Sequence, residues 1–465
     1  MRWLRMLVAR GAAGCALAVG IALGAPPVAA QVQGQDPDTV VLTLEDALGI
    51  ARGSSPAYRQ AVNSSGLNQS AWRTMLLTSV VPSVSLNLFG TDYYGNIQRR
   101  ATDFYGNPIE NPNAEWVYYS NTSQALTLSW DVQGSDIFNA IDRQKLDNRS
   151  RLISEARALI DLEVAVEREY WSLVEQDELR SAEEELLAAS QLDRDATERL
   201  FRLGARNRVD VLNAELAIER QRLALRQQQA EVERAKLALR ARLGDEELEA
   251  FEPAPADLPS LDPTTLDADA LVRMALAVNP SMESARVSVE QARVERRDAN
   301  RQWWPQLYVN YTLGRNAQTR ETAALFDLSF NEDLDQRFSI GLRLPMFNSY
   351  FQNRQSQRQA AVTLQNQTEA ERAERLALEQ SVRGAHLALE YQWDNLRISE
   401  RAAEIAAEAL DLAREEYRLG SSTFQELRQS IDSEADARRQ VIQARHSVAD
   451  ALLDLESAVG TRLRD

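Results

Sequence analysis

The sequence is poor in the residues that most enzymes and metal sites require. Its 465 residues include one Cys, two His and 19 Gly. A single Cys can form neither a disulfide framework nor a zinc cluster. The histidines, His386 and His446, have no Ser/Asp pair or ligand cluster nearby, and no GxxxxGK(S/T) phosphate loop occurs. We therefore predict that the protein is not an enzyme and has no catalytic, cofactor-binding or metal-binding residues.

The chain also has fewer basic residues than acidic ones. The chain has 52 Lys and Arg against 69 Asp and Glu, which gives a formal net charge of −17. A surface of this sign repels phosphate backbones, which excludes a general nucleic-acid-binding protein. Ala, Leu, Glu, Gln and Arg dominate long stretches instead, a composition typical of extended helices and coiled coils.

Long apolar runs are missing everywhere except at the N-terminus. There, three arginines precede an apolar run from Gly11 to Ala25, and Val28-Ala29-Ala30 offers a small-x-small cleavage site. We predict a signal peptide over residues 1–30 that exports the chain; lipidation at Cys15 is the alternative. After residue 30, no stretch reaches the ~20 apolar residues of a spanning helix. Any membrane crossing would therefore be made by β-strands.

The chain contains an internal duplication. Val81-Pro82 recurs as Trp304-Pro305, 223 residues later, and Phe201-Arg202-Leu203-Gly204 recurs as Tyr417-Arg418-Leu419-Gly420, 216 residues later. A proline-rich stretch separates the two copies, and neither helix nor sheet persists through such a stretch. We predict a signal peptide (1–30), an N-terminal equatorial segment (31–56), a first repeat (57–251), a linker (252–266) and a second repeat (267–465).

Two segments of each repeat alternate between apolar and polar residues, which predicts four β-strands: 83–92, 121–131, 305–314 and 336–345. Their length and period are those of outer-membrane strands, and aromatic residues cluster at their ends. A soluble sheet with one wet face is the alternative. In lipid, four strands would leave two unpaired edges, so membrane insertion requires several copies. Three copies give twelve strands, enough to leave a lumen.

The remaining length is predicted to be helical, with apolar residues recurring by sevens as in coiled coils. The expected helices cover 57–81, 133–203 and 205–243 in the first repeat, and 281–303, 347–419 and 422–460 in the second. At 1.5 Å per residue, the longest span about 105 Å. The turns at Gly204 and Gly420 are then about 100 Å from the strands.

This order of elements resembles the TolC family of outer-membrane channel proteins over residues 40 to 463. The strongest signatures are the paired segments Phe201–Leu212 and Tyr417–Leu427. The resemblance implies a mainly α protomer with a small β part. Three protomers would form a twelve-stranded β-barrel in the outer membrane that continues into a periplasmic α-helical barrel. It also implies a passive exit duct for efflux or type I secretion. The implied partners are two further copies, outer-membrane lipid, a periplasmic adaptor (membrane fusion) protein and an inner-membrane pump or ABC exporter.

The resemblance also implies roles for residues near the two turns. Those implied to dock the adaptor are Arg202, Leu203, Gly204, Ala205, Arg418, Leu419, Gly420 and Ser421. Tyr417 and Asp210 occupy the places of a Tyr–Asp link that closes the tunnel. A basic residue that strengthens this link in some members corresponds to Ser422, so that part is missing or is supplied by Arg206 or Arg208. Glu426 occupies the first position of an acidic constriction ring, and Gln429 stands at the second, where an acid is usual.

Two other functions stay open on the sequence alone. One is a periplasmic coiled-coil adaptor or scaffold, although no lipoyl-like or barrel insertion is visible between the helices. The other is a metal-ion efflux channel on the same fold, which the scarcity of His and Met does not favour. The cargo could be drugs, metal ions or proteins. The sequence names neither the adaptor, the transporter nor the resting state of the gate.

Overall fold

The structure, a computed structural model, describes residues 40–99, 102–103, 105–108, 114–132, 136–245, 251–255, 258–319, 334–344 and 346–464. The predicted signal peptide and Cys15 lie outside this part of the chain. The chain divides into two compact units, Met1–Val40 and Val41–Asp465, and the account below concerns the second.

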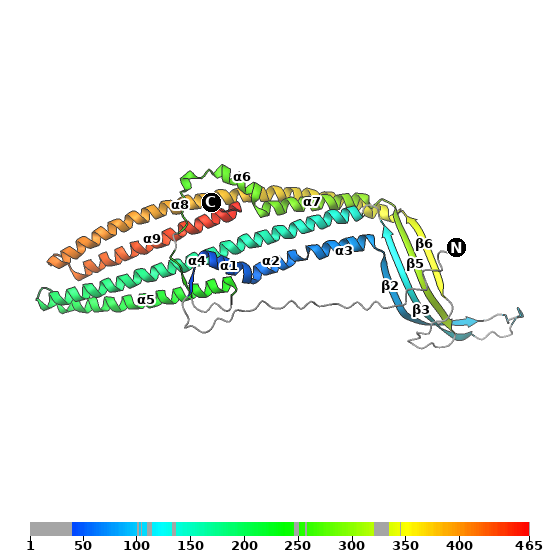
Figure 1. Ribbon diagram of the computed structural model, residues 1–465, viewed down its shortest axis with the longest axis horizontal. Coiled ribbons are helices and arrows are strands. Elements are labelled where there is room, and N and C mark those ends of the chain that lie inside the picture. The colour runs from blue at the N-terminus through cyan, green and yellow to red at the C-terminus, as the bar shows by residue number, and fades with distance from the viewer. Residues whose placement is uncertain are drawn as a thin grey trace. The chain divides into compact units, whose positions relative to one another are not determined.

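The fold is mainly helical with a small sheet, as predicted (Figure 1). The elements in chain order are β1 (Val40–Leu42), α1 (Leu44–Ser54), α2 (Pro56–Gly66), α3 (Asn68–Val80), β2 (Ser83–Arg99), β3 (Ala114–Val132), α4 (Asp136–Arg202), α5 (Arg208–Leu243), β4 (Phe251–Pro253), the 3-10 helix η1 (Pro263–Thr265), α6 (Ala268–Val278), α7 (Pro280–Arg301), β5 (Gln306–Thr319), β6 (Asp335–Arg343), α8 (Asn348–Leu419) and α9 (Phe424–Val459).

The sheet is antiparallel, with strand order β2-β3-β5-β6. Along one row, Leu128 pairs with Val84 on one side and with Tyr311 on the other, and Tyr311 pairs with Phe338. The next row, through Thr127, consists of Ser, Thr and Arg side chains. Because neighbouring rows point to opposite faces, one face of the sheet is apolar and the other is polar.

Strands β2 and β3 are longer than the alternating segments 83–92 and 121–131. They pair from Ser83 with Ser129 to Arg99 with Ala114, and a register shift follows Asn87. The sequence shows Gly95 in this extension, a residue that usually weakens a strand. In the structure, the ring of Tyr118 covers Gly95 so closely that an added Cβ would lie 2.9 Å from it. A cross-strand aromatic ring thus compensates for the missing side chain.

The long helices have nearly the lengths that the sequence predicts. Helix α4 has 67 residues and α8 has 72, and neither contains a proline. The predicted helix 57–81 is instead two helices, α2 and α3, which meet at Leu67 just after Gly66. Gly in a helix interior costs ~1 kcal/mol relative to Ala, which makes this the weak point of the segment.

The helices pack in an order that follows the sheet. Helix α4 runs along α5, α8 runs along α9, and α4 also contacts α9. Nearer the sheet, α3 contacts α4, α4 contacts α7, and α7 contacts α8. Helices α4 and α7 are therefore flanked on both sides by helices of the same chain. Helices α3 and α8 stand next to the edge strands β2 and β6.

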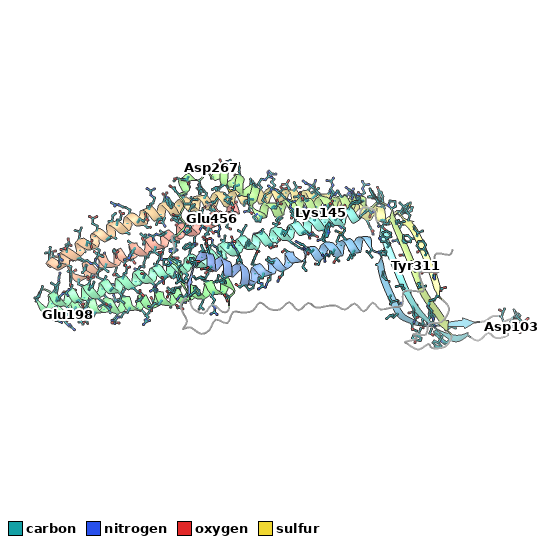
Figure 2. The ribbon with its side chains drawn as sticks, viewed as in Figure 1. Asp103, Lys145, Glu198, Asp267, Tyr311 and Glu456 are labelled. Atoms are coloured by element: carbon teal, nitrogen blue, oxygen red, sulfur yellow. The ribbon has the colours of Figure 1, made fainter. Side chains whose placement is uncertain are left out.

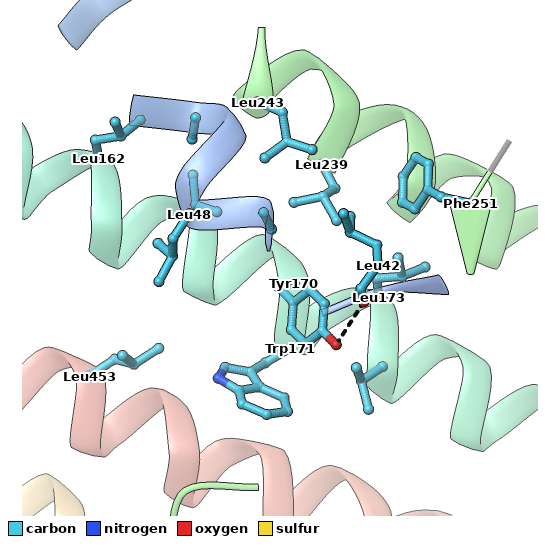
Figure 3. Packing of buried hydrophobic residues seen from close by; sticks show 14 of the residues in the cluster. Leu42, Leu48, Leu162, Tyr170, Trp171, Leu173, Leu239, Leu243, Phe251 and Leu453 are labelled. Atoms are coloured by element: carbon cyan, nitrogen blue, oxygen red, sulfur yellow. Dashed lines mark hydrogen bonds between the residues drawn. The ribbon is translucent and has the colours of Figure 1, made fainter. Parts of the chain in front are cut away.

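Two apolar cores lie where the short helices meet the long ones. In the first, α1 and the strands β1 and β4 pack against α4 and α5 around Tyr170 (Figure 3). The Tyr170 hydroxyl reaches the carbonyl oxygens of Leu42 at 3.2 Å and Ala254 at 3.3 Å. In the second, α6 and α7 pack against α8 and α9 around Leu389 and Leu452. Each fully buried large side chain contributes about 1.5–3 kcal/mol of stability.

Among the described residues, no helix is long and apolar enough to cross a membrane.

Candidate functional site at the two hairpin tips

The chain reverses direction twice at the ends of the long helices, from α4 to α5 and from α8 to α9. Gly204 and Gly420 both have positive φ, 75° and 82°. The amide of Gly204 donates to the carbonyl oxygen of Phe201, and the amide of Ala205 donates to that of Leu200. These two bonds form a Schellman motif, which ends a helix with a left-handed residue. The second hairpin has the same two bonds: the amide of Gly420 donates to the carbonyl oxygen of Tyr417, and the amide of Ser421 donates to that of Glu416.

The turns place the predicted docking residues at the surface. Leu203 is 81% exposed and Leu419 is 80% exposed. No neighbour lies within 4 Å of where a Cβ on Gly204 or Gly420 would stand. The arginines before the leucines are held on their own helices: Arg202 pairs with Glu198 at 2.6 Å, and Arg418 pairs with Glu415 at 2.6 Å. Each tip therefore presents an exposed leucine next to an arginine that is held by an ion pair on its own helix.

The two predicted acidic residues have the same local role in the two hairpins. Asn207 and Asp210 form a capping box at the start of α5, and Thr423 and Glu426 form one at the start of α9. The Glu426 carboxylate accepts a bond of 2.7 Å from the amide of Thr423, and the Asp210 carboxylate accepts one of 3.3 Å from the amide of Asn207. These bonds satisfy amides at the helix start that would otherwise lack a partner. Glu426 is exposed.

Tyr417 lies in the contact between the hairpins. It is 5% exposed, and its hydroxyl is 3.3 Å from the Thr197 hydroxyl on α4. Phe424 packs edge-on against its ring at 6.0 Å. The structure shows no hydrogen bond between the Tyr417 hydroxyl and Asp210 among the described residues, because the Asp210 carboxylate caps its own helix. Burial raises the pKa of Tyr417, so its phenol is protonated at neutral pH.

Arg206 connects the first turn to the second hairpin. Its guanidinium stands 4.0 Å above the centroid of the Tyr417 ring and also donates to the Tyr417 carbonyl oxygen. A cation over an aromatic face and a charged hydrogen bond together hold the two hairpins at this point. The sequence pointed to Arg206 or Arg208 near this place; the structure brings Arg206 to Tyr417. Ser422, the repeat counterpart of Arg206, is buried.

Further contacts between the hairpins follow above the tips. Glu185 and Glu183 on α4 pair with Arg438 at 2.5 Å and Arg439 at 3.2 Å on α9. Gln221 on α5 also donates to the buried Glu183. Closer to the tip, burial raises the pKa of Asp193, although Arg414 lies 4.0 Å away. The sequence analysis missed these residues.

The signal that could have revealed the tip contact is the heptad spacing. Tyr417, Phe424 and Ile431 are seven residues apart and all belong to one buried cluster with Leu427. Within α8 the row runs from Leu410 to Tyr417, and within α9 from Phe424 to Ile431, so each helix presents one packing face to this cluster. The Glu183–Arg439 contact has no comparable signal, because it joins charged residues 256 positions apart.

Comparisons with known proteins relate part of the chain to a known family and nearly all of it to known structures. Residues 271–461 match the model of the outer membrane efflux protein family. The match covers 191 of the 465 residues. The matched stretch lies within the second repeat and contains the second hairpin with Tyr417 and Gly420. No curated protein sequence is detectably similar to the chain.

Solved structures share the fold over nearly the whole chain. The outer-membrane channel OprN is 16% identical with a TM-score of 0.70, and the comparison covers 91% of each chain. The open state of the MtrE outer membrane channel of Neisseria gonorrhoeae is 18% identical with a TM-score of 0.66, covering 90% of this chain and 89% of that one. The outer membrane protein VceC of Vibrio cholerae is 15% identical with a TM-score of 0.67, covering 90% and 96%. The chain therefore shares the fold of these three proteins over 90–91% of its length.

Proposed function

We propose that the protein is a passive outer-membrane exit duct of a tripartite efflux or type I secretion system. Three copies would close the channel, and their helical tips would dock a periplasmic adaptor in contact with an inner-membrane transporter. The observation that carries the proposal is the efflux-family match of residues 271–461 on a fold shared with outer-membrane channels. It favours a channel over the periplasmic adaptor or scaffold.

The sheet supports assembly from several copies. Strands β2 and β6 are its edges, and each has a neighbour on one side only among the described strands. Apolar side chains on these edges are open: Leu86 is 64% exposed and Phe338 is 66% exposed. Unpaired edges are unstable in water and in lipid alike, and an exposed apolar face is unstable in water but not in lipid. Pairing β6 of one copy with β2 of the next would satisfy both edges and leave the polar face inside.

The helices carry a matching pair of open faces. On α8, large apolar side chains recur every seven residues and are 55–68% exposed; they are Tyr391, Ile398, Ile405 and Leu412. On α5, a second seam of the same period is 49–65% exposed; it consists of Val209, Leu216, Leu223 and Leu237. Heptad seams of this kind pack against another helix. Because the two seams lie on different helices of one chain, contact of one with the other in a neighbouring copy is head-to-tail, and such contacts form a ring when the rotation between copies closes.

The tips support docking of a helical partner. The exposed leucines at 203 and 419 are surrounded by charged residues, the arrangement of a small apolar anchor in a polar rim. The clasp of Arg206 on Tyr417 lies directly behind them and joins the two hairpins of one copy. A partner that engages both tips can therefore act on the contact that holds the hairpins together.

Mass and conductance measurements test the proposal. Native mass spectrometry of the purified chain in detergent is expected to give three copies, and planar lipid films are expected to show discrete ion conductance steps. A single copy in detergent together with absent conductance would refute the proposal. Disrupting the seam with Ile398→Asp and Ile405→Asp should yield monomers, whereas Leu192→Asp, an exposed leucine outside both seams, should leave the trimer intact.

A further inference from the structure

The helix turns nearest the sheet are basic, although the protein is acidic. Four equal stretches adjoin the strands: 70–80 of α3, 136–146 of α4, 291–301 of α7 and 348–358 of α8. Together they hold nine Arg and Lys but four Asp and Glu. The equal stretches at the tips hold seven basic and eleven acidic residues. Positive charge is therefore concentrated where the helices meet the sheet, in a chain of net charge −17.

Exposed aromatic side chains lie at the sheet end of this basic zone. Phe138 at the start of α4 is 68% exposed, and Phe351 at the start of α8 is 72% exposed. Seven residues further from the sheet, on the same helical faces, stand Lys145 and Arg358, both exposed. Seven residues correspond to about 10 Å along the axis. On the side of α7, Arg301 lies over Trp304, with 5.8 Å between guanidinium and ring. Such an order of aromatic and then basic groups matches a membrane interface, where rings lie at the headgroup level and cations reach the phosphates.

A groove between α4 and α7 contains the centre of this zone. It has a volume of about 430 Å³ and is lined by four basic side chains, two acidic ones and two apolar ones, namely Lys145, Arg149, Arg293, Arg297, Asp142, Glu290, Leu146 and Val294. Asp142 is paired with Arg297 at 2.6 Å, and Glu290 is 3.3 Å from Arg149. Within the described residues, neither Lys145 nor Arg293 forms an ion pair. Figure 2 shows Lys145 on α4, with Glu198 near the other end of the same helix.

A neighbouring copy does not account for the groove. Helix α4 is flanked by α3 and α7, and α7 is flanked by α4 and α8 of the same chain. Contacts between copies would involve the edge elements instead. The two unpaired cations on α4 and α7 therefore remain available to another partner in the assembled channel.

We propose that this groove binds the phosphate headgroups of anionic phospholipids at the periplasmic surface of the membrane. The proposal rests on the outer-membrane placement proposed above. Lys145 and Arg293 supply the unneutralised charge, and Leu146 and Val294 provide an apolar floor for the glycerol region. Phe138 lies toward the sheet from these residues and reaches the acyl boundary. The bound lipid would fix the depth of the channel at the junction between sheet and helices.

The test compares lipids on the assembled protein in a neutral detergent. Added phosphatidylglycerol should raise the melting temperature, whereas phosphatidylcholine and inorganic phosphate at equal concentration should not. The double variant Lys145→Gln/Arg293→Gln should bind phosphatidylglycerol at least tenfold more weakly, since each basic residue near an anionic surface contributes roughly fivefold in affinity. Arg220→Gln/Arg226→Gln removes the same charge from exposed positions on α5 and should bind as the unmodified protein does.

Three outcomes would overturn the proposal. One is unchanged phosphatidylglycerol affinity in the Lys145/Arg293 variant, and another is an equal effect of phosphatidylcholine. The third is an equal effect of inorganic phosphate, which would indicate a site for free anions. Trimer mass and conductance are measured on the same samples. If the unmodified protein shows neither trimer mass nor conductance, the exit-duct function is refuted. Lipid binding that depends on Lys145 and Arg293 would still show a lipid site in that case.

Discussion

The two hairpin tips have nearly the same backbone but different side chains. Both end the first helix with an exposed leucine and a left-handed glycine, and both begin the second with a capping box. The clasp between hairpins, however, comes from one side only. Arg206 in the first turn reaches Tyr417, whereas the buried hydroxyl of its counterpart, Ser422, has no hydrogen-bond partner among the described residues. The features that both tips share, the glycine and the capping box, therefore form the turn. Arg206, which only the first tip has, joins the two hairpins.

The counterparts of the clasped ring show the same asymmetry. Phe201 in the first hairpin is 37% exposed, and Tyr417 in the second is 5% exposed. Phe201 has no hydroxyl, so it could not make the bond that Tyr417 makes with Thr197. We infer that the two tips serve equally in docking but unequally in holding the hairpins together.

The largest expected effect comes from removing both exposed leucines. In Leu203→Asp/Leu419→Asp, affinity for the periplasmic adaptor should fall by a factor of about 1,000, because an apolar anchor at an interface is often worth about 2 kcal/mol, or about 30-fold in affinity. Binding of the adaptor's helical hairpin is measured by calorimetry. The two single variants should lose affinity to a similar extent, each less than the double variant. Leu192→Asp, at a 69% exposed position further from the tip on α4, should lose no affinity. A single variant with the full loss would show that the tips are not equivalent in docking.

The next largest effect is expected in the first hairpin only, on substitution of Arg206. Arg206→Ala removes a cation–π contact and a charged hydrogen bond, which together are worth about 2 kcal/mol. We expect lower stability and a higher basal conductance in planar lipid films, since the hairpins lose their connection at the tip. Ser422→Ala is the matched control and should change neither quantity. If the two variants behave alike, the clasp does not hold the hairpins.

These contrasts also show what the sequence could and could not predict. The turns followed from repeated Arg-Leu-Gly segments, and the strands and long helices followed from periods of two and seven. The far ends of β2 and β3 did not, because the ring that stabilises Gly95 comes from the opposite strand. The contact of Arg206 with Tyr417 could not be predicted, since the two residues are 211 positions apart in sequence. Local patterns determine elements and turns, whereas the contacts between hairpins depend on how distant helices align.

A smaller and symmetric effect is expected at the glycines. Alanine in the left-handed region costs about 1–2 kcal/mol, and both Gly204 and Gly420 have open space where a Cβ would stand. Gly204→Ala and Gly420→Ala should therefore lower the unfolding free energy by similar amounts, measured by denaturant titration of the detergent-solubilised protein. Unequal losses would mean that the turns differ in more than their side chains.

The smallest effect separates the two roles considered for Glu426. As a capping residue, it should behave like Asp210, so Glu426→Ala and Asp210→Ala should each cost about 1 kcal/mol or less. As part of an acidic ring in a narrow pore, it should also attract cations, and only Glu426→Ala should then weaken block by multivalent cations. Single-channel recordings with a multivalent blocker distinguish the two, and Gln429→Ala serves as the neutral control one turn along the helix. Equal block in both acid variants would leave Glu426 as a helix cap, because a ring of three carboxylates close enough to select ions cannot lose its charge without changing cation affinity.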